Sequence, residues 1–296
     1  MYTIIKAENS SCYYRKIENN AVRLIWEITG RCNLNCVHCF ANVNSDAGFS
    51  KNELTTSEAL HIIEQFKDIN VGKVLLTGGE PLLRKDIELI IQNIRKQSDD
   101  IIIDLQTNGL LINDNLIACL KENAVKELSI SLDGPQNTYR RVRGQNVDFQ
   151  KLLKNIENLT ALGIIVSCAM VLNKETIDTL EETIELAKSV GVSCLTIANL
   201  VRIEISNFDY ESLKITEQQK NDVFAKVHSL QDKYRDNPVV RTIGFQACTD
   251  SDNCPNRNII AINRNGMYLR CLSTYKEGYS LLNSRDYSLK EAHEML

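Results

Sequence analysis

Residues 22–40 read VRLIWEITGRCNLNCVHCF, an apolar run followed directly by a cysteine-rich loop. The run Val22–Thr29 has the length and the branched apolar residues of a buried strand. Cys32, Cys36 and Cys39 then follow with the spacing C-x-x-x-C-x-x-C. Three thiolates this close can bind one side of a cubane iron–sulfur cluster and leave a fourth iron free for a substrate or cofactor. The alternative is a zinc site completed by the histidine inside the loop, which would have to turn back to the same ion across a very short span.

The composition is that of a globular protein. The chain has 296 residues, of which 43% are hydrophobic and 24% charged, so we expect one large domain or two ordinary ones. There is no run of about eighteen apolar residues and no apolar core in the first twenty residues, which predicts a cytoplasmic protein without a membrane span. The net charge of -4, without a basic block, argues against nucleic acid as a partner.

Ten cysteines are more than such a chain needs for packing. A disulfide framework is improbable in a cytosolic chain that is long enough to build its own core, so metal binding is the better explanation. Besides the loop at residues 32–39, a second group consists of Cys248, Cys254 and Cys271. The sequence therefore predicts two metal sites.

Strand-like and helix-like stretches alternate between residues 22 and 200, a pattern typical of a parallel sheet covered by helices. We expect six strands in this region. They are Val22–Thr29, Lys73–Thr77, Ile101–Thr107, Lys126–Leu132, Ile164–Leu172 and Cys194–Leu200.

Two of these strands carry polar residues on one face, because alternate residues of a strand point to opposite sides of the sheet. Helices must cover the outer face of a parallel sheet, so the polar face should line an interior space that holds something polar. The residues concerned are Asp104, Gln106 and Asn108 in one strand and Ser129, Ser131 and Asp133 in the next.

The sequence changes character after about residue 205. A charged helix is expected over Thr216–Arg235, and Asn265-Gly266 between two apolar stretches predicts a β-hairpin. We therefore divide the chain into an N-terminal extension (1–21), a strand–helix domain (22–205), a linker helix (206–236) and a small C-terminal domain (237–296).

At this point the sequence resembles the radical S-adenosylmethionine enzymes. The wording Cys-Asn-Leu-x-Cys-x-His-Cys with the aromatic Phe40 is similar to the branch with SPASM or twitch C-terminal domains. Three further motifs follow in order, each at the carboxyl end of an expected strand. They are Thr77-Gly78-Gly79-Glu80-Pro81, Thr107-Asn108-Gly109 and Ser131-Leu132-Asp133-Gly134-Pro135. The resemblance covers residues 22 to about 275 and implies an α/β fold, a partial (β/α)6 TIM-like barrel with a small hairpin and helix domain for an auxiliary cluster.

The resemblance also implies the cofactors and their ligands. Cys32, Cys36 and Cys39 would hold a 4Fe-4S cluster whose open iron binds S-adenosylmethionine, and one electron would cleave the cofactor to a 5'-deoxyadenosyl radical. Further contacts to S-adenosylmethionine are expected from Phe40, Gly78, Gly79, Glu80, Pro81, Asn108, Ser131, Asp133 and Arg143. Arg140 and Arg141 lie beside Arg143, and an arginine after a strand is more often part of a surface salt bridge.

The second cysteine group is similar to the opening half of the SPASM pattern, as Cys254-x(11)-Gly266-x(4)-Cys271. Together with Cys248 it implies one auxiliary 4Fe-4S cluster, with the fourth ligand open. A zinc site of three cysteines and one other ligand remains the alternative.

The family suggests an oxidoreductase or maturase. We expect hydrogen abstraction from an unactivated carbon, with a ribosomally synthesised peptide as the favoured substrate and a flavodoxin- or ferredoxin-like protein as the reductant. One alternative is a twitch-type dehydrogenase, or a cofactor or haem biosynthesis enzyme, that acts on a small molecule. An alternative of another class is an iron–sulfur electron-transfer or sensor protein.

Overall fold

A computed structural model describes residues 21–39, 41, 52–202, 208–234, 238–243, 258–270 and 282–296. In these parts of the chain the strands form a single sheet with the order β7-β6-β5-β4-β3-β2-β1-β8-β9. All neighbours are parallel except β8 and β9. The strands are β1 (Val22–Glu27), β2 (Val71–Thr77), β3 (Ile102–Thr107), β4 (Glu127–Ser131), β5 (Ile165–Leu172), β6 (Cys194–Asn199), β7 (Val239–Ile243), β8 (Ile259–Ile262) and β9 (Tyr268–Leu269).

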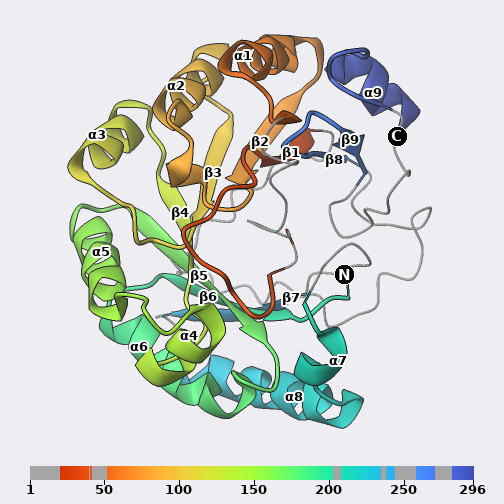
Figure 1. Ribbon diagram of the computed structural model, residues 1–296. Helices are drawn as coiled ribbons and strands as arrows, with labels where there is room; N and C mark the ends of the chain where they lie inside the picture. Colours follow the sequence, from red (N-terminus) through yellow and green to blue (C-terminus); the bar gives the residue numbers. More distant parts are fainter. Residues whose placement is uncertain are drawn as a thin grey trace.

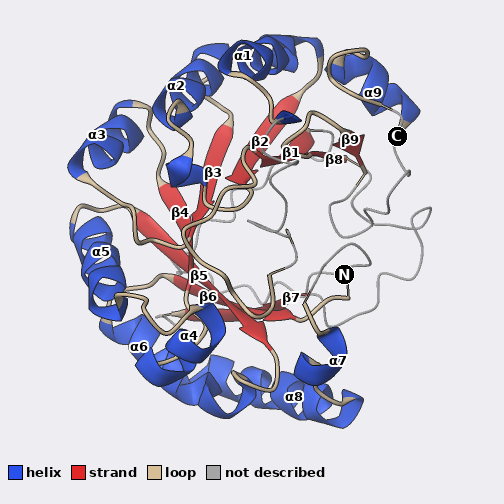
Figure 2. Cartoon of the chain, viewed as in Figure 1, coloured by secondary structure: helices blue, strands red, loops and turns tan. Residues whose placement is uncertain are grey.

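The helices lie on the outer side of the curved sheet, which forms an open arc between β7 and β9 (Figures 1 and 2). The α-helices are α1 (Thr56–Glu64), α2 (Ile87–Gln97), α3 (Asp114–Glu122), α4 (Gln136–Arg143), α5 (Phe149–Ala161), α6 (Leu180–Ser189), α7 (Tyr210–Leu213), α8 (Glu217–Lys233) and α9 (Leu289–Met295). Short 3-10 helices cover η2 (Gln65–Asp68), η3 (Pro81–Leu83) and η4 (Ile177–Thr179). None of the described helices is long and apolar enough to cross a membrane.

The six expected strands are confirmed, and their ends differ from the expected ones by only one or two residues. The alternation along β1 shows why they form a covered sheet. Leu24, Trp26 and Ile28 are completely buried, whereas Arg23, Ile25 and Glu27 on the other face are only partly buried. Because apolar residues face the helices, the opposite face is left to line the interior of the partial barrel.

The expected hairpin is present, with Ala261 opposite Leu269 and Ile262 opposite Tyr268. Its turn uses Gly266 at φ +83°, a conformation that suits glycine. The sheet is larger than six strands, however, because β8 pairs in parallel with β1 and β7 pairs in parallel with β6. The described strands of residues 237–296 thus belong to the barrel sheet, where β8 covers the open edge of β1. The separate C-terminal domain stays a prediction.

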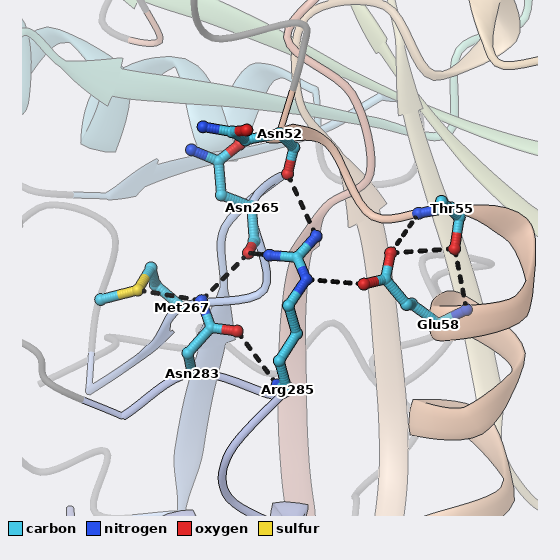
Figure 3. A network of polar contacts seen from close by, with 7 residues as sticks. All are labelled: Asn52, Thr55, Glu58, Asn265, Met267, Asn283 and Arg285. Atoms are coloured by element: carbon cyan, nitrogen blue, oxygen red, sulfur yellow. Dashed lines mark hydrogen bonds and ion pairs between the residues drawn. The ribbon is translucent and has the colours of Figure 1, made fainter.

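Arg285 ties the end of the chain to the rest of the fold (Figure 3). Its Nε donates to Glu58 Oε1 at 2.6 Å, Nη1 to the Asn265 carbonyl at 3.0 Å and Nη2 to the Asn52 carbonyl at 3.3 Å. Glu58 also accepts from the backbone of Thr55 at 2.7 Å, in the capping box of α1. One guanidinium therefore connects the C-terminal segment, the β8–β9 turn and the start of α1.

We expect Arg285→Ala to lower the free energy of unfolding by about 1 kcal/mol, because partly exposed charged hydrogen bonds are weakened by solvent. Hydrogen bonds from Arg285 and Thr55 hold the pKa of Glu58 down at about 2, below the ordinary 4.5. A depressed carboxyl pKa stabilises the fold above the unfolded pKa, and this stabilisation is lost as the pH falls towards 2. The effect of the substitution should therefore be smaller at pH 3 than at pH 7.

Urea unfolding followed by circular dichroism at the two pH values measures this difference. Lys290→Ala is the control, since Lys290 is an exposed cation of α9 that forms no ion pair with the described residues. Equal losses from the two substitutions would show that the network does not stabilise the fold.

Candidate functional site

The cysteine loop leaves the carboxyl end of β1. Cys32, Cys36 and Cys39 are partly exposed and form no disulfide. Burial raises the pKa of Cys32 to about 11, and the nearby Cys36 and Cys39 add to this rise. Three soft sulfur donors in one loop fit the side of an iron–sulfur cluster, and binding of iron would deprotonate them.

A preformed site for a single metal ion is not seen. Over the described ranges, which include the cysteine loop, no three side chains of His, Cys, Asp or Glu are gathered to hold one ion. His38 is buried, its Nδ1 has no hydrogen-bond partner, and burial lowers its pKa to about 4. This arrangement does not match the zinc alternative, in which the histidine would complete the site.

The Gly78-Gly79 turn after β2 packs against the beginning of the cysteine loop. Gly79 N donates to the Thr29 carbonyl at 2.7 Å, and Glu80 N donates to the Arg31 carbonyl at 2.7 Å. A Cβ at Gly79 would lie 2.2 Å from the Arg31 carbonyl oxygen, and Gly78 has φ +137°. Both glycines are therefore needed for contact with the loop, quite apart from the contact with S-adenosylmethionine that the resemblance implies.

Glu80 is completely buried and connects this turn to the end of β3. Its carboxylate accepts from Thr107 Oγ1 at 2.7 Å, Asn108 N at 2.7 Å and Leu82 N at 3.1 Å. Burial raises its pKa, and these hydrogen bonds oppose the rise. A carboxylate has about four lone-pair positions, so one remains for a further donor. Pro81 is buried as the first residue of η3.

Asn108 reaches the cysteine loop directly. Its Nδ2 donates to Asn33 Oδ1 at 2.7 Å, and its Oδ1 accepts from Leu110 N at 3.1 Å. Ser131, at the end of β4, is partly buried, and the alternation along its strand places it on the interior face. The structure thus brings Asn108 to the loop itself.

Arg143 lies between Asp133 and the cysteine loop. Its Nε donates to Asp133 Oδ2 at 2.5 Å, and its Nη1 lies 3.5 Å from Cys36 Sγ. Asp133 is completely buried, and its Oδ1 accepts from Val171 N at 2.7 Å. Desolvation would lower the pKa of Arg143, but the negative charge of Asp133 more than offsets it and the pKa is raised. The arginine is therefore oriented with its positive charge beside a cysteine of the loop.

The two neighbouring arginines have other environments. Arg141 makes an exposed ion pair with Glu175 at 2.9 Å. Arg140 Nε is buried without a hydrogen-bond partner. Arg143, in contrast, contacts the cysteine loop at Cys36, so it is not the surface salt-bridge residue expected as the alternative.

The interior face of the barrel is polar, as the alternation of residues predicts. Asp104 pairs with Lys73 at 3.0 Å and accepts from Ser129 at 3.1 Å. The sequence analysis named Asp104 and Ser129 but missed two further polar contacts. Ser167 Oγ donates to Glu127 Oε1 at 2.7 Å, and Arg241 Nε donates to Thr196 Oγ1 at 2.6 Å.

The sequence analysis also missed Glu27 and Arg264, which lie near the loop. Glu27 lies on the interior face at the end of β1, and Arg264 comes from the β8–β9 turn. Burial raises the pKa of Glu27 to about 7, although the charge of Arg264 opposes the rise. No motif pointed to either. Of the expected site residues, Phe40, Cys248, Cys254 and Cys271 lie outside the described residues.

The family assignment follows from comparison with known proteins. The model of the Radical SAM superfamily matches residues 26–187. The chain belongs to the radical SAM superfamily. Membership implies an enzyme with a 4Fe-4S cluster and S-adenosylmethionine, which argues against the pure electron carrier or sensor.

Curated relatives of this radical SAM enzyme include proteins that act on small molecules. The chain is 34% identical over 204 residues to the AdoMet-dependent heme synthase of Methanosarcina barkeri, a match that covers 66% of this chain and 57% of the synthase. It is 24% identical over 280 residues to the GTP 3',8-cyclase of Nautilia profundicola, covering 91% of this chain and 86% of the cyclase. The chain spans only about half the length of the first of these relatives.

Solved structures share the fold at low sequence identity. Streptococcus suis SuiB bound to S-adenosylmethionine has a TM-score of 0.77 and 17% identity, over 92% of this chain and 65% of SuiB. The protein anSMEcpe with bound AdoMet has a TM-score of 0.71 and 17% identity, over 93% of this chain and 80% of anSMEcpe. These similarities support the partial barrel of the radical SAM enzyme.

We expect Gly79→Ala to lower the rate of 5'-deoxyadenosine formation from S-adenosylmethionine by at least about tenfold, because the added Cβ must displace backbone at the start of the cysteine loop. The rate is measured by chromatography with reconstituted protein and a chemical reductant. Gly163→Ala is the control. Gly163 has a positive φ of +77°, unlike Gly79, and free space around its Cβ, so this variant should lose about 1 kcal/mol of stability and keep its rate. If both variants kept the wild-type rate, the close packing at Gly79 would have no role.

We expect Arg143→Lys to weaken binding of S-adenosylmethionine about tenfold while the cluster is retained, because lysine lacks the planar fork that Asp133 orients. Binding is measured by equilibrium dialysis, and the cluster by iron content and absorbance. Arg141→Lys, on the same helix, changes an exposed ion pair with Glu175 and hydrogen bonds to Thr138 and Glu175, none of them at the cysteine loop, and should bind as wild type does. Unchanged binding by the Arg143 variant would contradict the role.

Proposed function

We propose that this radical SAM enzyme abstracts a hydrogen atom from an unactivated carbon of a ribosomally synthesised peptide. One observation supports the radical chemistry in this proposal. The three thiols, the Gly78-Gly79 turn and the Asp133-oriented Arg143 all meet at the carboxyl ends of β1, β2 and β4. Ligand sites of parallel barrels lie at this end of the strands.

The residues present fit the two groups that the family implies. Cys32, Cys36 and Cys39 would hold a 4Fe-4S cluster, and Arg143 would lie near the carboxylate of S-adenosylmethionine. When bound, these groups together supply a one-electron cleavage that produces a 5'-deoxyadenosyl radical, the species that removes the hydrogen.

The remaining residues of the site hold and orient. Glu80 keeps one lone pair for the ammonium group of S-adenosylmethionine while it fixes the turn to Thr107 and Asn108. Asp133 prevents Arg143 from turning away. Gly78 and Gly79 let the backbone approach the loop, and Ser131 offers a hydroxyl from the interior face.

A peptide is favoured by the polar interior, which can satisfy amide groups of a main chain. Proteins with a related fold include SuiB bound to its precursor peptide SuiA and anSMEcpe bound to the Cp18Cys peptide. We further propose that Cys248, Cys254 and Cys271 bind an auxiliary 4Fe-4S cluster that takes up the electron of the substrate radical, and that a flavodoxin- or ferredoxin-like protein is the reductant.

A second candidate substrate is a small tetrapyrrole. The observation in its favour is the 34% identity to a heme synthase, which is well above the identity to the two peptide-linked structures. The alternative shares the radical chemistry and differs in what fills the barrel.

Separate incubations with a peptide and with a porphyrin distinguish the two candidate substrates. Anaerobically reconstituted protein is supplied with dithionite, S-adenosylmethionine and either a short peptide encoded beside the gene or an iron porphyrin with propionate groups. We expect a peptide product that lacks two hydrogen atoms. One hydrogen atom is transferred to 5'-deoxyadenosine, and the other leaves as a proton while its electron passes to the proposed auxiliary cluster. Conversion of the porphyrin alone would replace the peptide proposal, and no 5'-deoxyadenosine from either incubation would contradict the whole reaction.

A further inference from the structure

Arg264 contacts both ends of the cysteine loop from a distant part of the chain. It leaves the turn between β8 and β9, and 8% of its surface is exposed. Its Nη1 donates to the carbonyl of Ala41, just after Cys39, at 3.1 Å. Its side chain also covers Gly30, just before Cys32.

The space above Gly30 is filled by this side chain. A Cβ added to Gly30 would lie 2.6 Å from Nη1, 2.7 Å from Cδ and 2.8 Å from Cζ of Arg264. The backbone of Gly30 does not have a positive φ, so its lack of a side chain is explained by this contact and not by its conformation. Arg264 thus lies flat against the start of the loop while it donates to the end.

The backbone around these contacts is fixed as well. The Arg264 carbonyl accepts from Leu54 N at 2.9 Å. The adjacent Glu53 accepts from Gly30 N at 2.6 Å and from Thr29 Oγ1 at 3.2 Å. Residues 53 and 54 therefore hold Arg264 and the start of the loop relative to each other.

Charge also favours this position of Arg264. Glu27, on the interior face of β1, is attracted to it. A guanidinium that is mostly removed from water needs such a counter-charge and several acceptors. Arginine meets this requirement with a planar group and five N–H donors, and lysine does not.

We propose that Arg264 is a positioning residue for the metal cluster: by contacting Gly30 and Ala41 together, it holds the two ends of the cysteine loop at the separation that the cluster requires. The inference deepens the proposed function, since it concerns the loop in which the cluster would sit. It also gives the β8–β9 turn a part in the radical site.

The test compares three variants of the full-length, reconstituted protein. Arg264→Ala removes the side chain. Gly30→Ala leaves Arg264 in the chain but pushes it off the loop, at little cost to the backbone. Arg285→Ala loosens the same β8–β9 turn through Asn265 without touching the loop, and is the matched control (Figure 3).

The first measurement is the rate at which iron is released to a ferrous chelator. Only the kinetic phase that is absent from a Cys36→Ala variant is counted, because this phase reports the cluster in the cysteine loop. We expect this rate to rise about tenfold in Arg264→Ala and in Gly30→Ala, the scale found when outer partners of metal ligands are removed. Arg285→Ala should release iron as wild type does. The second measurement is the electron paramagnetic resonance spectrum of the reduced cluster, whose change on addition of S-adenosylmethionine should be incomplete in the first two variants.

Wild-type release from Gly30→Ala, or equal acceleration by Arg285→Ala, would overturn the proposal. If Arg264→Ala fails to fold by circular dichroism, Gly30→Ala decides alone. Iron release requires neither substrate nor turnover, so a wrong peptide assignment would leave this result standing, and failure of the positioning role would leave the peptide assay unaffected.

Discussion

Two backbone hydrogen bonds between neighbouring strand ends are the constraint on which the site depends. Gly79 N binds the Thr29 carbonyl, and Glu80 N binds the Arg31 carbonyl. They are possible because β1 and β2 run parallel with Glu27 opposite Thr77, so that the chain segments beyond both strands leave the sheet level with each other. The cysteine loop therefore starts in a direction set by the sheet. Any side chain at position 79 would separate the two segments, which explains why the turn next to the cysteine loop consists of glycine.

Charges in the barrel fall into two groups with different consequences. Lys73 and Asp104 neutralise each other inside the barrel, where an isolated charge would be costly. The arginines at the loop are also paired, but each keeps a part of its guanidinium directed at the loop. Arg143 does so beside Cys36, and Arg264 does so at Gly30 and Ala41. The positive charge of Arg143 favours the thiolate form of Cys36, although burial raises the pKa of this thiol overall. Arg264 acts on the backbone at the two ends of the loop instead.

Local patterns were enough to predict the strands. Apolar runs of strand length located the six strands, and the alternation in β3 and β4 correctly indicated a polar interior. The role of Glu80 was only partly foreseen, because its three protein donors come from the end of β3 and from η3. Glu53, Glu27 and Arg264 were missed altogether. They carry no motif, and their significance depends on contacts with a loop that is distant in sequence.

The position of Arg264 follows from the register of one strand pair. Trp26 lies opposite Ile262. Ile28 and Arg264, each two residues further along, therefore lie level with each other at the start of the cysteine loop. Nothing local in either segment determines a register between stretches more than 200 residues apart, which is why the sequence predicted the hairpin but not where it pairs. Formation of this long-range pair closes a large loop of chain and comes at an entropic cost. Because β8 must be in place before Arg264 can reach Gly30 and Ala41, the C-terminal hairpin is a structural part of the cysteine loop's environment and not an appendage to the barrel.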